Sequence, residues 1–160
     1  QQADMAAEGK PIVVRPSYEI LKTLVNEHGR EGKKNGKGFY DYPTEGDKYL
    51  WPELVNLYPP KSEQPSQQDL VDRLMFIQAN ESAKCYEENV VRSVADTNIG
   101  SIFGWGFAPQ HGGTLQFINA MGVSAFVERS RELAAKYGER FEPAQILLDM
   151  AAKGEAFSDD

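Results

Sequence analysis

Cysteine, histidine and long apolar runs are all scarce in this chain of 160 residues. The one cysteine, Cys85, excludes an intramolecular disulfide and fits a reducing compartment. Neither of the two histidines has another histidine, a cysteine or an acidic residue at metal-ligand spacing, so we expect no metal site. No apolar stretch approaches the ~20 residues that span a bilayer, and the polar start shows no leader segment. These absences predict a cytoplasmic protein with no membrane span.

Positive charge is also in short supply. The chain has 17 Lys and Arg against 24 Asp and Glu, which gives a net charge of -7 at pH 7. Because phosphate backbones bind to clustered positive charge, this balance argues against a nucleic-acid partner. The hydrophobic content of 41% is typical of a globular protein, and the length allows one or two small domains. The first residue is not Met, as expected for a fragment of a longer protein.

Proline divides the chain into two parts. Five of the nine prolines fall in residues 43–65, and we expect a long connector there, interrupted by a helical turn at residues 51–58. The predicted boundary therefore separates residues 1–65 from residues 66–160. In the first part, a helix is expected from Pro16 to Gly29. Proline is well tolerated in the first turn of a helix, and glycine commonly follows its last turn.

Beyond the connector, the apolar spacing is helical almost throughout. Ser66 and Ser93 each stand where a helix would begin, with an acidic residue in the first turn of each. We expect Phe107 and Phe126 in the core, and no segment has the period-2 pattern of a strand. The predicted fold class is therefore all-α. The first of these helices is expected to be buried along a broad apolar face made of Leu70, Val71, Leu74, Ile77, Ala79, Ala83 and Tyr86.

The glycines of residues 32–38 interrupt the helical pattern and are followed at once by aromatic residues. Glycine adopts positive φ at little cost, so Gly36 and Gly38 predict a tight turn with positive φ at Gly38. This turn would direct Phe39 and Tyr40 onto a neighbouring surface. We interpret the four residues as a structural turn.

The same segment resembles the G-x-K-x-G-x-G-F-Y turn found late in 3-hydroxyacyl-CoA dehydrogenases. Residues 67–157 resemble, in order, the last helical repeat of the multifunctional fatty-acid oxidation enzymes, which join an enoyl-CoA hydratase to an NAD-dependent 3-hydroxyacyl-CoA dehydrogenase. The segments that carry this resemblance include Arg73–Ala79, Ala83–Glu88, Val94–Asp96, Ile99–Pro109, Gly112–Gly113, Phe117–Ile118 and Tyr137–Pro143. Two positions depart from the family pattern, at Gln110-His111 and at Thr114, so the contacts of this loop are open.

The resemblance implies a helical domain like the C-terminal domain of 6-phosphogluconate dehydrogenase, preceded by an irregular N-terminal arm that ends an earlier repeat. It places the glycine fingerprint for NAD and the catalytic His–Glu pair in a preceding nucleotide-binding domain, and neither has a matching position here. We therefore expect no catalytic residue, no cofactor and no activity in this chain alone. The implied partners are the missing domain, the acyl-CoA substrate and a second copy in a homodimer.

The basic residues beside the turn have two interpretations. Lys33, Lys34 and Lys37, with Arg30, form a local positive patch on an acidic chain, which could attract the phosphates of coenzyme A. The alternative is a solvated turn. His111 lies in a glycine-rich loop and is the better of the two histidines for a ligand contact.

Two wider alternatives stay open. The chain could instead be a self-contained helical module that binds an acyl-CoA or a protein without catalysis. The segment Asp4–Gly9 also recurs almost unchanged as Asp149–Gly154, which is either a true repeat or a coincidence of alanine-rich helix ends.

Overall fold

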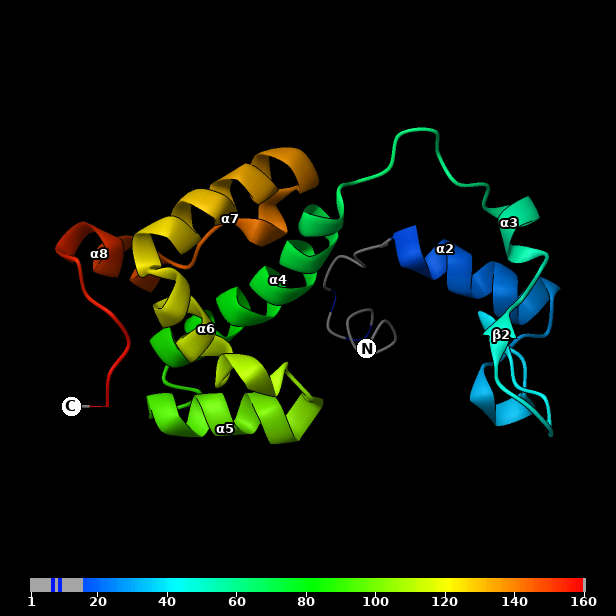
Figure 1. Ribbon diagram of the computed structural model, residues 1–160, viewed down its shortest axis with the longest axis horizontal. Helices are drawn as coiled ribbons and strands as arrows, with labels where there is room; N and C mark the ends of the chain where they lie inside the picture. The colour runs from blue at the N-terminus through cyan, green and yellow to red at the C-terminus, as the bar shows by residue number, and fades with distance from the viewer. Residues whose placement is uncertain (1–6, 8, 10–15, 160) are drawn as a thin grey trace. The chain divides into compact units, whose positions relative to one another are not determined.

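The computed structural model describes residues 7, 9 and 16–159. The chain forms two compact units, residues 1–64 and residues 65–160, a division one residue from the boundary that the prolines predict. Most of the described residues are helical, so the all-α class is confirmed (Figure 1). The Asp4–Gly9 half of the internal echo falls mainly outside the described residues.

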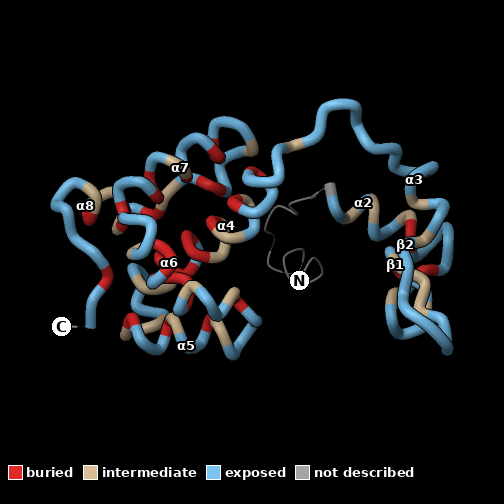
Figure 2. Tube along the Cα trace, in the orientation of Figure 1, coloured by how far each residue is buried: buried red, intermediate tan, exposed pale blue. Residues whose placement is uncertain are grey.

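From residue 16 on, the first unit consists of a helix, several turns and a minimal sheet. Its elements are α2 (Pro16–Lys22), a π-helical turn η1 (Thr23–Glu27), a 3-10 turn η2 (Lys33–Asn35), strands β1 (Tyr40–Asp41) and β2 (Tyr49–Leu50), and α3 (Leu54–Leu57). The strands pair antiparallel with Tyr40 opposite Leu50. The expectation of no strand was therefore wrong, because two residues are too few to show a period of two. Among the described residues of this unit, Leu24 is the one buried hydrophobic residue. Most of the described tube of this unit has the colour of exposed residues (Figure 2).

The second unit is a helical bundle. Its elements are α4 (Gln67–Glu87), α5 (Val94–Trp105), η3 (Pro109–His111), α6 (Thr114–Met121), α7 (Val123–Tyr137), η4 (Glu139–Phe141) and α8 (Gln145–Lys153). The α6 helix packs on α4, α5 and α7, while α8 packs on α4 and α7. Ser66 and Ser93 accept hydrogen bonds from Asp69 N (3.1 Å) and Asp96 N (2.9 Å), which confirms both predicted helix starts.

Aromatic rings fill the centre of this bundle. Phe76 of α4 stacks on Phe126 of α7 with ring centroids 4.3 Å apart, and Phe117 of α6 meets both rings edge-on. Phe107 lies edge-on to Phe117 at 6.2 Å. Phe107 and Phe126 are both buried, as the sequence predicts. The core therefore joins α4, α6 and α7 through one aromatic cluster.

The buried face of α4 differs from the predicted one at its first turns. Leu70, Val71 and Leu74 are exposed, whereas Asp69 and Asp72 are buried. The predicted apolar face was wrong there, because polar and charged side chains far along the chain bind the two buried carboxylates.

Those compensating residues come from α7. Asp69 accepts hydrogen bonds from Lys136 Nζ (2.6 Å), Tyr137 Oη (2.6 Å) and Arg129 (2.7 Å). Arg129 Nε also donates to Asp72 at 2.8 Å. The hydrogen bonds from Lys136, Tyr137 and Arg129 hold the pKa of Asp69 well below its ordinary value, so the carboxylate stays ionised. This cluster fixes the start of α4 against the end of α7.

Side chains from elsewhere in the chain also bind the starts of α6 and α5. Asn98 of α5 accepts hydrogen bonds from Leu115 N (2.9 Å) and Gln116 N (3.1 Å) at the start of α6. The Asp159 carboxylate accepts from the backbone at the start of α5, including Ala95 N at 2.7 Å. Because each cap satisfies donors that the helix itself leaves free, the caps also fix how the helices sit against one another.

Candidate functional site

The glycine turn of the first unit is built around Arg30. The Arg30 guanidinium is buried and donates to Gly38 O at 2.6 Å and to the Asp41 carboxylate at 2.6 Å. It also lies over the Trp51 ring, 4.2 Å from the centroid. Arg30 therefore holds the turn to the strand pair and is not part of an exposed basic patch. The sequence prediction that placed it there was wrong, because nothing local signals its distant partners.

The two glycines of the predicted turn have different roles. Gly36 has φ of 75°, the left-handed conformation expected of a turn glycine. Gly38 does not have positive φ, so that prediction was wrong. A Cβ on Gly38 would lie 2.9 Å from the Gly32 Cα, closer than two carbons can pack. Glycine is required there by the close approach of two backbone segments.

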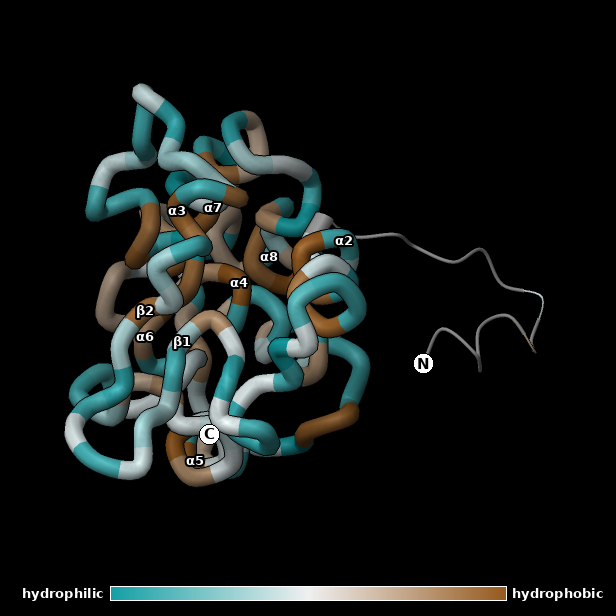
Figure 3. The backbone as a smooth tube through the Cα atoms, turned by 90° about the vertical axis from the view of Figure 1, so that its right-hand side faces the viewer, coloured by the Kyte–Doolittle hydropathy of each residue, from teal (hydrophilic) through white to brown (hydrophobic). Residues whose placement is uncertain are grey.

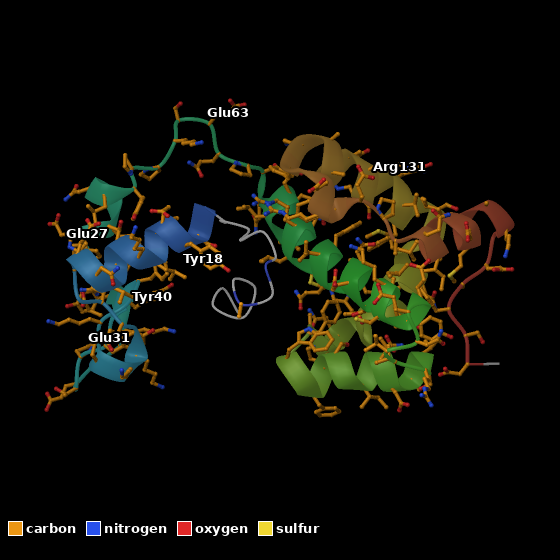
Figure 4. All side chains as sticks on the ribbon, turned by 180° about the vertical axis from the view of Figure 1, so that it is seen from behind. Tyr18, Glu27, Glu31, Tyr40, Glu63 and Arg131 are labelled. Atoms are coloured by element: carbon orange, nitrogen blue, oxygen red, sulfur yellow. The ribbon has the colours of Figure 1, made fainter. Side chains whose placement is uncertain are left out.

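The two aromatic residues after the turn are not deeply buried. Phe39 is exposed, and Tyr40 is half-buried in β1. Figure 4 labels the Tyr40 side chain in this unit. A shallow pocket of about 340 Å³ is lined by both of them, together with residues of α2, η1 and the turn. The turn directs these rings beside the helix of its own unit.

The three lysines of the predicted phosphate patch are all exposed on and beside η2. Lys34 Nζ lies 3.0 Å from the Glu31 carboxylate, which partly neutralises the positive charge of Lys34. Within the described part of the chain, Lys33 and Lys37 have no ion pair. Two unpaired cations at the surface are compatible with a phosphate contact and equally with a solvated turn.

The second unit has an apolar groove between α4 and α5. It measures about 540 Å³. Trp105 Nε1 of α5 donates to Gln78 Oε1 of α4 at 3.0 Å, linking the two walls. Sequence analysis gave no indication of this groove. The lining residues are Gln78, Glu81, Ser82, Cys85, Val90, Val91, Asp96, Thr97, Gly100, Gly104 and Trp105.

In the part of the chain that the structure describes, neither histidine is hydrogen-bonded to a carboxylate, and both contact aromatic rings. The exposed His28 meets Trp51 edge-on at 5.1 Å, and His111 packs against Phe117 at 5.2 Å. Among the residues that the structure describes, no group of three His, Cys, Asp or Glu could hold a metal ion. Within the same residues, no helix has the length and apolar character needed to cross a membrane.

Comparison with known proteins identifies the relationship. No protein-family model matches the chain. The fatty acid oxidation complex subunit alpha of Vibrio campbellii is 38% identical over 165 aligned positions, which cover 98% of this chain. This chain is homologous to the C-terminal part of that protein. The predicted resemblance to the C-terminal helical region of the fatty-acid oxidation enzymes is thus confirmed, and the chain spans 23% of the length of this relative.

Proposed function

We propose that the chain is the C-terminal helical part of an NAD-dependent 3-hydroxyacyl-CoA dehydrogenase of fatty-acid β-oxidation, working in the cytoplasm. The observation that carries this proposal is the 38% identity across 98% of the chain to the C-terminal part of a fatty acid oxidation complex subunit alpha. In this role the helices support the acyl-CoA cleft and provide surface for association.

The proposed division of labour follows from the side chains present. Oxidation of a 3-hydroxyl to a ketone needs a base for the hydroxyl proton and a carboxylate to orient that base, while NAD accepts the hydride. His28 and His111 contact aromatic rings, and neither is hydrogen-bonded to a carboxylate in the described part of the chain. We therefore assign the base and the NAD site to the preceding nucleotide-binding domain and expect the chain alone to be inactive.

Within this chain, the exposed lysines are the residues that we propose to contact the substrate. Lys33 and Lys37 are the cations of the turn that no carboxylate pairs, so they are the residues we assign to the phosphates of coenzyme A. Lys34, paired with Glu31, contributes less. Replacing Lys33 and Lys37 by Ala in the complete enzyme should raise the KM for acyl-CoA and leave kcat near its original value.

Reassembly tests the main proposal. The chain is mixed or co-expressed with the preceding part of the parent protein, and NADH production from a 3-hydroxyacyl-CoA is followed. Activity that needs both parts supports the proposal, and no activity from a folded, associated pair contradicts it. Calorimetric titration of the chain alone with NADH should show no micromolar binding, and substrate-dependent NADH production by the chain alone would also contradict it.

A self-contained helical binding module is the second candidate. It is favoured by the continuous core of residues 65–160 and by the 540 Å³ groove, a volume typical of small-molecule sites. Micromolar binding of acyl-CoA to the chain alone would support this candidate. Glu81 and Asp96 line the groove and would repel the phosphates of coenzyme A, so the dehydrogenase proposal is the stronger.

A further inference from the structure

The helix α5 buries little apolar surface. Figure 3 draws parts of it in hydrophobic colours, yet its side chains Ile99, Phe103 and Trp105 are each more than half exposed. Of its three buried residues, only Val94 is hydrophobic. Segments with few buried apolar contacts open at a lower free energy than the core of a domain. The position of α5 therefore depends strongly on its polar contacts.

These polar contacts lie at the end, the middle and the start of α5. At the end, Trp105 Nε1 donates a hydrogen bond to α4, and in the middle Asn98 accepts two from the start of α6. At the start, the backbone N–H groups of Val94 and Ala95 both donate to the Asp159 carboxylate. A residue that lies beyond α8 in the chain thus holds the first turn of α5.

The segment that carries Asp159 is docked through Phe157. The Phe157 ring is buried and meets Tyr86 of α4 edge-on, with ring centroids 5.7 Å apart. Phe157 N donates to Asn119 Oδ1 of α6, and Asn119 Nδ2 donates to Phe157 O, both at 2.9 Å. One amide side chain thus pairs with both backbone groups of Phe157, as a residue of a neighbouring antiparallel strand does. Figure 1 shows this segment, in red, running from α8 towards the start of α5.

Docking of Phe157 prepares the contact that Asp159 makes. The two residues are separated by one position, so a fixed Phe157 leaves the Asp159 carboxylate little space to explore. Ordering this carboxylate on α5 then costs less conformational entropy than ordering it from a free tail. Through these two residues, the segment 155–159 joins three helices, namely α4, α5 and α6.

We propose that residues 155–159 form a clasp that holds the start of α5 in the bundle, and that α5 opens when the clasp undocks. None of these five residues belongs to a helix or a strand, so undocking breaks no secondary structure within the segment. Asp96 and Thr97 of the first turns of α5 line the α4–α5 groove, as does Cys85 of α4. Release of the clasp therefore also opens this end of the groove.

Hydrogen exchange of the full chain, read by mass spectrometry, tests the clasp. Asp159→Ala should accelerate exchange at the amides of residues 98–103 by about five- to tenfold, the effect of losing a helix cap. Amides in α7 should keep their protection. Glu155→Ala is the matched control, because it removes a carboxylate from the same segment and Glu155 is exposed, 3.9 Å from Lys153. This control should leave exchange in α5 unchanged.

Phe157→Ala distinguishes a clasp from a helix cap that acts alone, because Phe157 makes its hydrogen bonds to α6 and its ring contact with α4. In a clasp, this variant accelerates exchange in α5 as much as Asp159→Ala does. The double variant then exceeds either single variant by less than about twofold, since both changes release the same segment. If Phe157→Ala does not fold, Asn119→Ala makes the same test, because it removes the two backbone bonds and keeps the ring.

Three results would overturn the clasp. The first is unchanged exchange in α5 when Phe157→Ala or Asn119→Ala is folded, and the second is equal acceleration in α5 and α7 for Asp159→Ala. The third concerns the half-buried Cys85, the one thiol of the chain. Its reaction with a thiol reagent should be faster in Asp159→Ala than in Glu155→Ala, and equal rates would show that the segment does not control the groove.

Discussion

Truncating Phe126 to Ala measures how much the aromatic cluster contributes to the bundle. Phe126 is fully buried and stacks on Phe76 with an interplanar angle of 3°. Removing a buried phenyl ring costs ~3–5 kcal/mol, and loss of the stacked pair favours the upper part of that range. A domain of this size is stable by ~5–15 kcal/mol in total, so the variant should be folded but marginal.

Urea unfolding followed by far-ultraviolet circular dichroism provides the assay, because the helices of the second unit dominate the signal. Phe103→Ala is the matched control: the same substitution at an 85% exposed ring should change the free energy of unfolding by less than ~0.5 kcal/mol. Both variants are compared at a concentration at which the original chain is monomeric. A loss below ~0.5 kcal/mol for Phe126→Ala, or equal losses for the two variants, would refute the assigned core.

Two further predictions concern the turn and the buried carboxylate. Gly38→Val should destabilise the chain by ~1–3 kcal/mol, because its Cβ would lie 2.9 Å from Gly32 Cα; an unchanged melting temperature would show that the two backbones can separate freely. Acidification below about pH 4 should progressively destabilise the second unit, because a carboxylate whose folded-state pKa is lowered contributes stability that is lost as pH falls towards that pKa. Asp69→Asn should lower the stability at neutral pH and flatten the acid limb of the stability–pH curve.

Local signals in the sequence predict the helices well. Ser66 and Ser93 cap helices because each can reach the backbone N–H three residues later, a contact that the chain makes with itself. Gly29 ends the first helical segment with φ of 62°, as a terminal glycine does. Phe126 on α7 and Phe107 in the loop after α5 are buried, as is usual for large apolar side chains.

The glycine turn shows where a local argument gives the correct residue for the wrong reason. Positive φ is the usual explanation for a glycine in a turn, and it holds for Gly36. At Gly38 the constraint is the distance to Gly32, which the paired backbone hydrogen bonds between Gly32 and Lys37 set at 2.6 and 3.0 Å. This pairing of two backbone segments is not visible in the spacing of the glycines.

The first turns of α4 were mispredicted for a related reason. Hydrophobicity alone orients Leu70, Val71 and Leu74 inwards, but the partners of Asp69 lie 60 to 68 residues further along the chain. Because α4 was expected to bury these residues, the sequence analysis also missed the apolar α4–α5 groove. The buried carboxylates orient α4 so that a different side of the helix is exposed.

The buried carboxylates and the exposed apolar face are therefore two consequences of one orientation of α4. With Asp69 and Asp72 bonded to α7, Leu74 must face away from the bundle, together with the groove residues that continue its stripe, Gln78 and Cys85. Burying an ion cluster at the start of a helix costs desolvation that an apolar face would not, so the cluster adds little stability beyond what an apolar face would give, although breaking it is destabilising. The cluster instead fixes the rotation of α4 about its own axis, because only one rotation brings both carboxylates to Arg129. The orientation that satisfies these charges therefore also leaves the apolar side chains Leu70, Val71 and Leu74 exposed.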